Sequence, residues 1–225
     1  MSIQDAPATL RRSRGRPQVR PDEETLRLIV DTAKQEFLTN CFNTVSMAQV
    51  AQRAGVSTKT MYRLVPTKGD LFRSVVAARL GRFFPEFDSK ELEALPLREA
   101  LTRLLTIYGE LTLGEEATRM YRLAVMESTR FPEIATAFFQ IAIEPTGLVF
   151  EKWLKRQAER GLIAVPDVKF ASEALRGMMA QEPQRAAVLK QKALPNSEAI
   201  AIRAQRCADL FLKGCAVHQP PPSAR

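Results

Sequence analysis

Residues 45–72, VSMAQVAQRAGVSTKTMYRLVPTKGDLF, decide the fold that we predict for this chain. Ser46 followed by Gln49 is a capping-box pattern, in which the hydroxyl and the glutamine side chain each satisfy a free amide at a helix start. Gly55 suits the left-handed residue that closes a helix, and Ser57 can cap a second helix directly after it. The stretch therefore predicts two short helices joined by a tight turn.

The outer face of the second predicted helix suits nucleic acid. Helical spacing turns the apolar residues of both helices inward and leaves four side chains on one outer face: Thr58, Lys59, Tyr62 and Arg63. In a helix-turn-helix the first residues of the second helix reach base edges in the major groove. We therefore expect Thr58 and Lys59 to contact bases. Tyr62 and Arg63 would contact the phosphate backbone.

A third helix start follows at Thr67. Thr67 is expected to cap this helix, and its free amides together with Lys68 would form an anion site suited to a phosphate. The predicted DNA-binding set also includes the capping residues Ser46 and Ser57 of the helix-turn-helix at 46–65. The alternative is an ordinary pair of helices with a solvated face, which matches fewer of these features.

This stretch resembles the TetR family of bacterial regulators from about Glu23 to Phe84. The matching residues are Thr44, Ser46, Val50, Ala51, Gly55, Val56, Ser57, Tyr62, Lys68, Leu71 and Phe72. The resemblance implies an all-helical homodimer with an N-terminal DNA-binding head and a larger C-terminal body. In this family the body binds a small molecule and then releases a palindromic operator, so the expected protein is a ligand-responsive repressor of transcription.

A second resemblance covers about residues 118–180. Glu127, RFPEI at 130–134, RGL at 160–162, Asp167 and Ala171 are similar to the C-terminal domain of AefR-like TetR regulators. This resemblance implies that the last two helices form the dimer interface. The candidate interface residues are Leu175, Met178, Met179, Ile200, Ala204, Cys207 and Phe211. Without that resemblance, an apolar stripe of this kind is more often internal core than interface.

The charge is concentrated at the N-terminal end. Residues 1–83 hold 14 Lys and Arg against 7 Asp and Glu, a net of +7, out of a net of +8 for the chain. Such a balance favours a polyanion partner, because binding releases counterions from the phosphates. Arg14 and Arg16 in RGRP at 14–17 resemble the core of an AT-hook, which follows a narrow minor groove. A plain basic tail is the alternative.

Helical periodicity continues to the end of the chain without strand-type alternation, which predicts an all-α fold. We expect a disordered basic arm at 1–21, a helix-turn-helix head at 22–84, a helical ligand-binding and dimerisation body at 85–217, and a flexible tail at 218–225. One helix should cover 22–39. Another should run from Lys68 to near Phe84, ahead of Pro85, followed by a connection at 86–96. Further helices are expected at about 97–112, 115–129, 132–143, 146–160, 167–181 and 197–214.

The middle of the body is rich in aromatic and methionine side chains, which line adaptable apolar pockets. The candidate pocket residues are Tyr108, Met120, Tyr121, Met126, Phe138, Phe150 and Trp153, with Glu127 as a polar contact. Ordinary core packing is the alternative for the apolar residues. A solvated or capping carboxylate is the alternative for Glu127.

Little in the sequence favours catalysis. The only histidine, His218, lies in the predicted tail, and no nucleophile, nucleotide-binding or metal-ligand motif is found. We therefore expect no cofactor and no metal. The three cysteines show no paired spacing, and no export signal or apolar run of membrane length is found, so we expect a cytoplasmic protein. Two other function classes are a helical module whose basic head binds an acidic protein, and a helical enzyme with carboxylates and tyrosines in a cleft.

Overall fold

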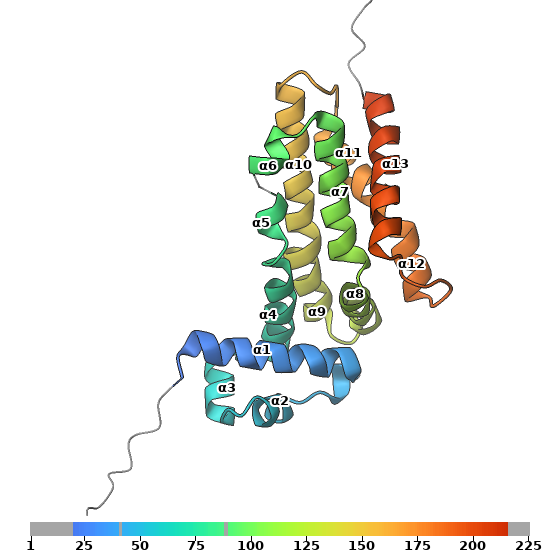
Figure 1. The fold of residues 1–225 in the computed structure, drawn as a ribbon. Coiled ribbons are helices and arrows are strands. Elements are labelled where there is room, and N and C mark those ends of the chain that lie inside the picture. The colour runs from blue at the N-terminus through green and yellow to red at the C-terminus, as the bar shows by residue number, and fades with distance from the viewer. Residues whose placement is uncertain (1–19, 41, 88–89, 216–225) are drawn as a thin grey trace, which may run out of the picture.

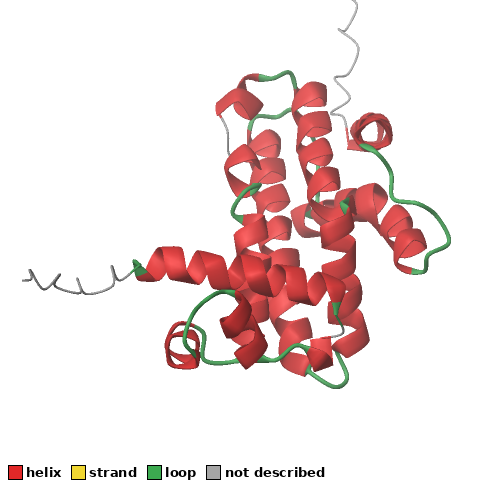
Figure 2. Cartoon of the chain, turned by 60° about the horizontal axis from the view of Figure 1, so that its bottom comes forward, coloured by secondary structure: helices red, strands yellow, loops and turns green. Residues whose placement is uncertain are grey.

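The computed structural model describes residues 20–40, 42–87 and 90–215, and helices make up all of its regular structure (Figure 2). Within these ranges the all-α prediction is confirmed. The predictions for the RGRP element with Arg14 and Arg16, and for the tail at 218–225, lie outside the described residues. None of the described helices combines the length and the apolar character that crossing a bilayer requires.

The head contains three helices at the bottom of Figure 1, with α1 (Asp22–Thr39) lying across α2 (Met47–Arg53) and α3 (Thr58–Leu64). A short 3-10 turn, η1 (Phe42–Thr44), precedes α2. The predicted start and end of α1 are confirmed, and Ile29, Ala33 and Phe37 are buried along its inner face. Two ion pairs, Arg53 with Glu36 and Arg63 with Asp22, fasten α2 and α3 to α1.

An aromatic cluster fills the head core and continues into the body. Phe42 stacks on Phe37 at 5.2 Å between ring centroids and meets Phe72 edge-on at 6.2 Å. Its other neighbour is Phe131 at 5.3 Å, which directly precedes α9 (Pro132–Phe138) in the body. Head and body therefore share one contiguous hydrophobic core.

The helix that begins at Lys68 is shorter than predicted. α4 (Lys68–Leu80) ends at Leu80 instead of near Phe84, and the amides of Arg82 and Phe83 then bond three residues back, as in a tight turn. Pro85 does not follow a helix end but lies in the first turn of α5 (Phe84–Phe87), where no amide proton is needed. A second short helix, α6 (Lys90–Ala94), lies in the stretch predicted to be a connection.

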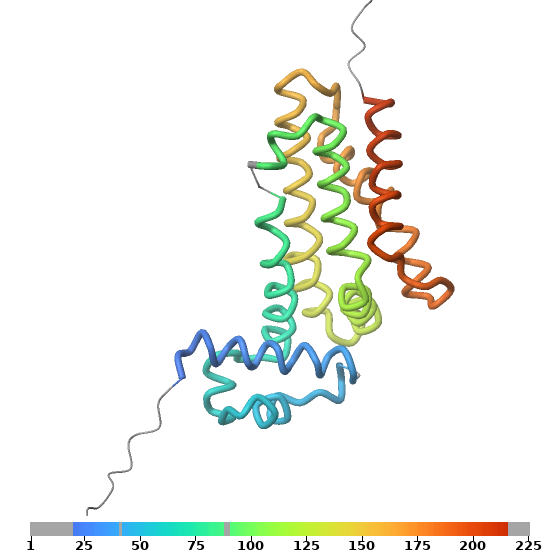
Figure 3. Tube along the Cα trace, viewed as in Figure 1, coloured from blue at the N-terminus to red at the C-terminus, as the bar shows by residue number. Residues whose placement is uncertain are grey.

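The body is a bundle of long helices above the head (Figures 1 and 3). Its helices are α7 (Leu97–Leu113), α8 (Glu115–Glu127), α9, α10 (Glu144–Glu159), α11 (Val168–Arg176), α12 (Glu182–Val188) and α13 (Ser197–Cys215). α13 packs along α7, and the bidentate pair of Arg98 with Asp209 joins them at 2.6 and 2.9 Å. The helices predicted for the body are present within a few residues of their expected bounds. α12 was not predicted.

Two pairs of these helices are joined by π-turns that were not predicted from the sequence. η2 (Phe139–Ile143) joins α9 to α10, and η3 (Gly177–Gln181) joins α11 to α12. Each π-turn ends one residue before a Glu-Pro pair. Because Pro145 and Pro183 lack an amide proton and crowd the preceding turn, a wider turn there keeps the helix continuous. The prolines therefore bend helices that we predicted to be interrupted.

The seven candidate interface residues prove to be part of the core. Six of them are buried within the single chain and Met178 is half-buried: Leu175, Met179, Ile200, Ala204, Cys207 and Phe211. α13 turns this stripe toward α7, so these side chains are not available to a second subunit. The exposed apolar side chains on the outer faces of α11 and α13 are Phe170, Ile202 and Leu210.

Candidate functional site

The helix-turn-helix forms through contacts between residues close in sequence. Ser46 Oγ accepts from the Gln49 amide at 3.1 Å, and Gln49 Oε1 accepts from the Ser46 amide at 3.2 Å, which completes the predicted capping box. Gly55 has a φ of +67°, a conformation that side-chain-bearing residues rarely adopt. Ser57 Oγ then accepts from the Thr60 amide at 3.0 Å and starts α3. Each cap is worth about 1 kcal/mol.

The four predicted contact residues of α3 all face outward. Thr58, Lys59, Tyr62 and Arg63 are exposed, whereas Met61 between them is fully buried. The guanidinium of Arg63 donates to both carboxylate oxygens of Asp22 at 2.6 Å, and this pairing lowers the pKa of Asp22. Exposed ion pairs contribute little to stability, so Arg63 can exchange Asp22 for a phosphate.

The start of α4 differs in its electrostatics from the site we predicted there. Thr67 Oγ1 does accept from the Asp70 amide at 3.0 Å, but it also donates to the Asp70 carboxylate at 2.7 Å. The Lys68 ammonium donates to the Phe42 carbonyl and lies 4.2 Å from the centre of the Phe42 ring. Burial lowers the pKa of Lys68, and the Glu127 carboxylate opposes this shift. Lys68 thus faces inward, and a phosphate contact by Lys68 stays a prediction.

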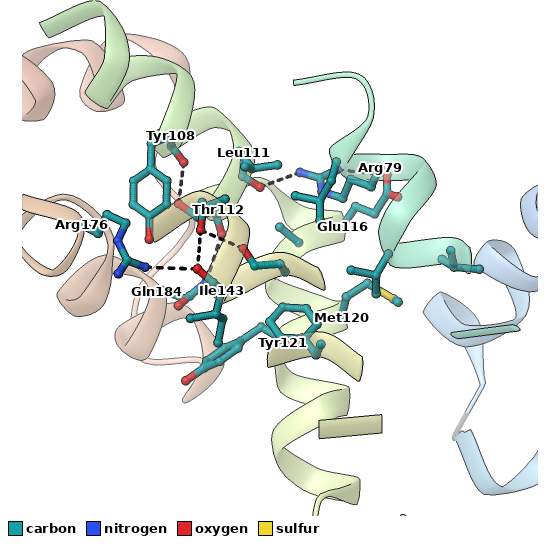
Figure 4. Close-up of a pocket in the computed structure, with 17 residues that line it drawn as sticks. Arg79, Tyr108, Leu111, Thr112, Glu116, Met120, Tyr121, Ile143, Arg176 and Gln184 are labelled. Carbon is teal, nitrogen blue, oxygen red and sulfur yellow. Dashed lines mark hydrogen bonds and ion pairs between the residues drawn. The ribbon is translucent and has the colours of Figure 1, made fainter. Parts of the chain in front are cut away.

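The body contains a cavity of about 200 Å³ between α4, α7, α8, the bent α9–α10 helix and the bent α11–α12 helix (Figure 4). Four of the predicted pocket residues line it: Tyr108, Met120, Tyr121 and Phe138. The rings of Tyr121 and Phe138 lie 5.9 Å apart. The cavity is therefore largely apolar and aromatic, as the composition of this region indicated.

The other predicted pocket residues lie elsewhere. Phe150 is fully buried behind Tyr108, with 5.3 Å between the ring centroids, and Trp153 lines a separate hollow beside Phe84 and Phe87. Met126 is 73% exposed, because six residues along α8 from Met120 turn it to another face. Glu127 lies near Lys68 at the junction of head and body.

The polar side chains of the cavity were not predicted from the sequence. Arg79 Nη2 donates to the Leu111 carbonyl at 2.9 Å, and Arg79 Nη1 lies 3.4 Å from the Glu116 carboxylate. Burial lowers the pKa of Arg79, and Glu116 opposes this shift. Arg176 and Gln184 enter from the other side of the cavity, as Figure 4 shows. One sequence pattern could have identified Arg79: it lies in helical register with Val75, Val76 and Leu80, which places it on the same inward face of the helix.

α4 connects the two candidate sites. Its first half contributes Leu71 and Phe72, which are fully buried against α1 and the aromatic cluster of the head. Its second half contributes Val75, Val76, Arg79 and Leu80 to the cavity wall. Glu116, which pairs with Arg79, also lies 3.9 Å from Lys34 on α1. α4 and this ion pair therefore connect the cavity wall to the head.

Two family models match the chain. "Bacterial regulatory proteins, tetR family" matches residues 29–75, and "AefR-like transcriptional repressor, C-terminal domain" matches residues 99–214. The chain belongs to the TetR family of transcriptional regulators, and its C-terminal domain is of the AefR-like kind. Both resemblances inferred from the sequence are confirmed.

Individual relatives agree with this assignment. An HTH-type transcriptional regulator of Mycobacterium tuberculosis is 28% identical over 114 residues, which are 51% of this chain and 58% of that relative's length. A TetR-family regulator from Mesorhizobium loti has a TM-score of 0.78 at 23% identity, over 88% of this chain and 100% of that one. The flavonoid-responsive regulator FrrA has a TM-score of 0.72 at 26% identity, with the same coverage.

Proposed function

We propose that the protein represses transcription by binding a palindromic operator in double-stranded DNA as a homodimer, and that a small apolar or amphipathic molecule in the cavity releases it. The observation that carries this proposal is the course of α4. One helix begins beside the helix-turn-helix and ends in the cavity wall, so occupancy of the cavity and placement of the head depend on the same rigid element.

In this proposal α3 enters the major groove with Thr58 and Lys59 at base edges. Tyr62 and Arg63 hold the phosphate backbone, with Arg63 leaving Asp22 to do so. The net charge of +7 on residues 1–83 draws the head toward DNA. The arm with Arg14 and Arg16 adds to this attraction.

A homodimer is needed because two heads must contact two half-sites about 34–36 Å apart, or a multiple of that distance. We assign the dimer contact to the outer faces of α11 and α13, where Phe170 is 67% and Leu210 is 65% exposed. Large apolar side chains exposed on the outer faces of α11 and α13 favour an isologous contact between two copies.

A molecule in the cavity would act by displacing its polar wall. Arg79 and Glu116 connect α4, α8 and α1, so an occupant that moves either side chain shifts α4 relative to α1. Only a differential affinity for the two arrangements can change DNA binding. The similarity to a regulator described as flavonoid-responsive supports a small-molecule effector of this kind.

Footprinting of genomic DNA with the purified full-length protein tests the proposal. We expect protection of a palindrome with two equivalent half-sites, and loss of affinity as the salt concentration rises. A protein that protects no site, or that binds an acidic protein regardless of added duplex DNA, would refute it. The protected site would also identify the neighbouring genes.

A further inference from the structure

The charges of the two cavity arginines are balanced to different degrees. Arg79 pairs with Glu116 at 3.4 Å and donates to the Leu111 carbonyl, so a carboxylate of the protein matches its charge. Arg176 forms no ion pair with any described residue. The Nε atoms of both arginines are buried without a hydrogen-bond partner, so the difference between them lies in the carboxylate that only Arg79 has. The cavity therefore contains one guanidinium in excess over its carboxylates.

Among the described residues, Arg176 has neutral acceptors and no carboxylate beside it. Its Nη1 donates to the Ile143 carbonyl at 3.5 Å, at the limit of hydrogen-bond length, and the Tyr108 hydroxyl is a second hydrogen-bond partner. Thr146 Oγ1 already donates to that same carbonyl at 2.9 Å and to the Ala142 carbonyl at 2.8 Å. A half-buried guanidinium in a cavity wall is costly to desolvate when no carboxylate pairs with it, and an anionic ligand would complete its charge pairing.

The fold holds this guanidinium in place. A Cβ atom added to Gly147 would lie 3.1 Å from Arg176 Nη2, so the guanidinium packs closely against α10 at this glycine. Ser172 Oγ donates to the Gly147 carbonyl at 3.1 Å and fastens α11 to α10 at the same level. The cation is thus seated between two helices, as in a preformed binding site.

Tyr108 supplies a second polar group beside Arg176. Its hydroxyl-bearing ring is buried in the cavity wall; burial raises the pKa of Tyr108, and the adjacent Arg176 opposes this shift. Since the phenol stays protonated at neutral pH, it can donate a hydrogen bond to an anion held by Arg176. Another part of the cavity wall is largely apolar and includes Met120, Phe138 and the ring of Tyr121.

We infer that the cavity binds a monoanionic amphipathic molecule, a carboxylate on a short aliphatic or monocyclic aromatic tail, with the carboxylate paired to Arg176. This inference rests on the proposed ligand response and specifies the chemistry of its effector. The cavity of about 200 Å³ limits the size of the ligand.

Matched acid and amide probes test the charge requirement. Calorimetric titrations of the full-length protein without DNA would use octanoate against octanamide, and 3-phenylpropanoate against 3-phenylpropanamide. Each pair differs in charge at nearly constant shape. The acids should bind about ten- to a hundredfold more tightly than the amides, because a hydrogen bond to a charged group is lost in the amide.

The variant Arg176→Met should abolish the preference for the acids, whereas Arg185→Met should retain it. Arg185 lies outside the cavity on α12, is exposed and pairs with Glu182, so it controls for the loss of one positive charge. A thermal melt establishes that each variant is folded. Equal affinity for acid and amide, absence of binding by both acids, or an unchanged preference in Arg176→Met would overturn the inference.

A separate DNA titration distinguishes this inference from the proposed function. Acids that bind in an Arg176-dependent way without releasing DNA would leave the inference standing and refute the ligand response. Release of DNA by acid and amide alike would support the ligand response and refute the inferred charge requirement. We expect the acids to release DNA from the wild type and not from Arg176→Met.

Discussion

The head and the body hold their functional arginines in opposite environments. The side chain of Arg63 on α3 is 54% exposed and pairs with Asp22 at the surface, where water screens the pair and either partner can be exchanged. The side chain of Arg79 is 18% exposed at the cavity, and Arg79 and Arg176 each have a buried Nε without a hydrogen-bond partner. An exposed cation remains solvated until a polyanion binds, whereas a half-buried cation without a carboxylate, such as Arg176, suits a small anion.

A related difference separates the two faces of α13. Phe211 is 8% exposed and packs in the core of the body, while its neighbour Leu210 is 65% exposed. The variant Phe211→Ala should therefore lower the free energy of unfolding by about 3–5 kcal/mol. Leu210→Glu should leave this free energy nearly unchanged and instead dissociate the proposed dimer. Urea unfolding and analytical sedimentation of both variants measure the contrast. A folded, dimeric Leu210→Glu protein would place the dimer contact elsewhere.

Glu116 tests whether the interior of the body is connected to the head. Glu116→Gln removes the carboxylate shared by Arg79 and Lys34, which leaves Arg79 buried without a counter-charge and should cost about 1–3 kcal/mol of stability. Glu110→Gln on α7 is the exposed control and should be neutral. Urea unfolding with fluorescence detection measures both variants. Equal stabilities would show that the Glu116 ion pairs do not connect the elements energetically.

The smallest effect is expected at the exposed pair of the head. Arg63 lowers the pKa of Asp22, so the stabilising contribution of this pair is present above the ordinary aspartate pKa and is lost as the pH falls through the lowered value. Asp22→Asn should remove this acid-dependent contribution and free Arg63 for phosphate. We expect a slightly higher affinity for DNA at neutral pH. A clearly weaker affinity would mean that Asp22 positions Arg63 for DNA binding.

The head could be predicted from the sequence because its signals are local. Ser46 bonds to Gln49, Ser57 to Thr60 and Thr67 to Asp70, each across three residues, and Gly55 alone determines the turn. Such contacts depend on residue type and spacing, which one sequence contains. Lys68 was expected to face a phosphate but faces inward. Its ammonium contacts the carbonyl and the ring of Phe42, which is distant in the sequence.

The cavity could be predicted only in composition. Aromatic side chains such as Tyr121 and Phe138 followed from the sequence, but Arg79, Glu116 and Arg176 meet through packing of three helices distant in the sequence. We predicted separate helices on either side of Pro145 and Pro183, but π-turns keep these helices continuous. The sequence could not show this, because a π-turn has no local pattern that distinguishes one bent helix from two helices. The interface stripe was misplaced for a similar reason, because periodicity identifies an apolar face without naming its partner.

We expect the outer face of α3 to bind DNA bases while the rest of the head positions this helix. A titration of the footprinted operator and of random duplex, at fixed salt, tests this claim with Lys59→Ala, Tyr62→Ala and the exposed α1 control Arg27→Ala. Lys59→Ala should lose operator preference by on the order of 1–3 kcal/mol. Tyr62→Ala should weaken binding to both duplexes, and Arg27→Ala should bind nearly as the wild type does. Wild-type operator affinity in both α3 variants would contradict the account.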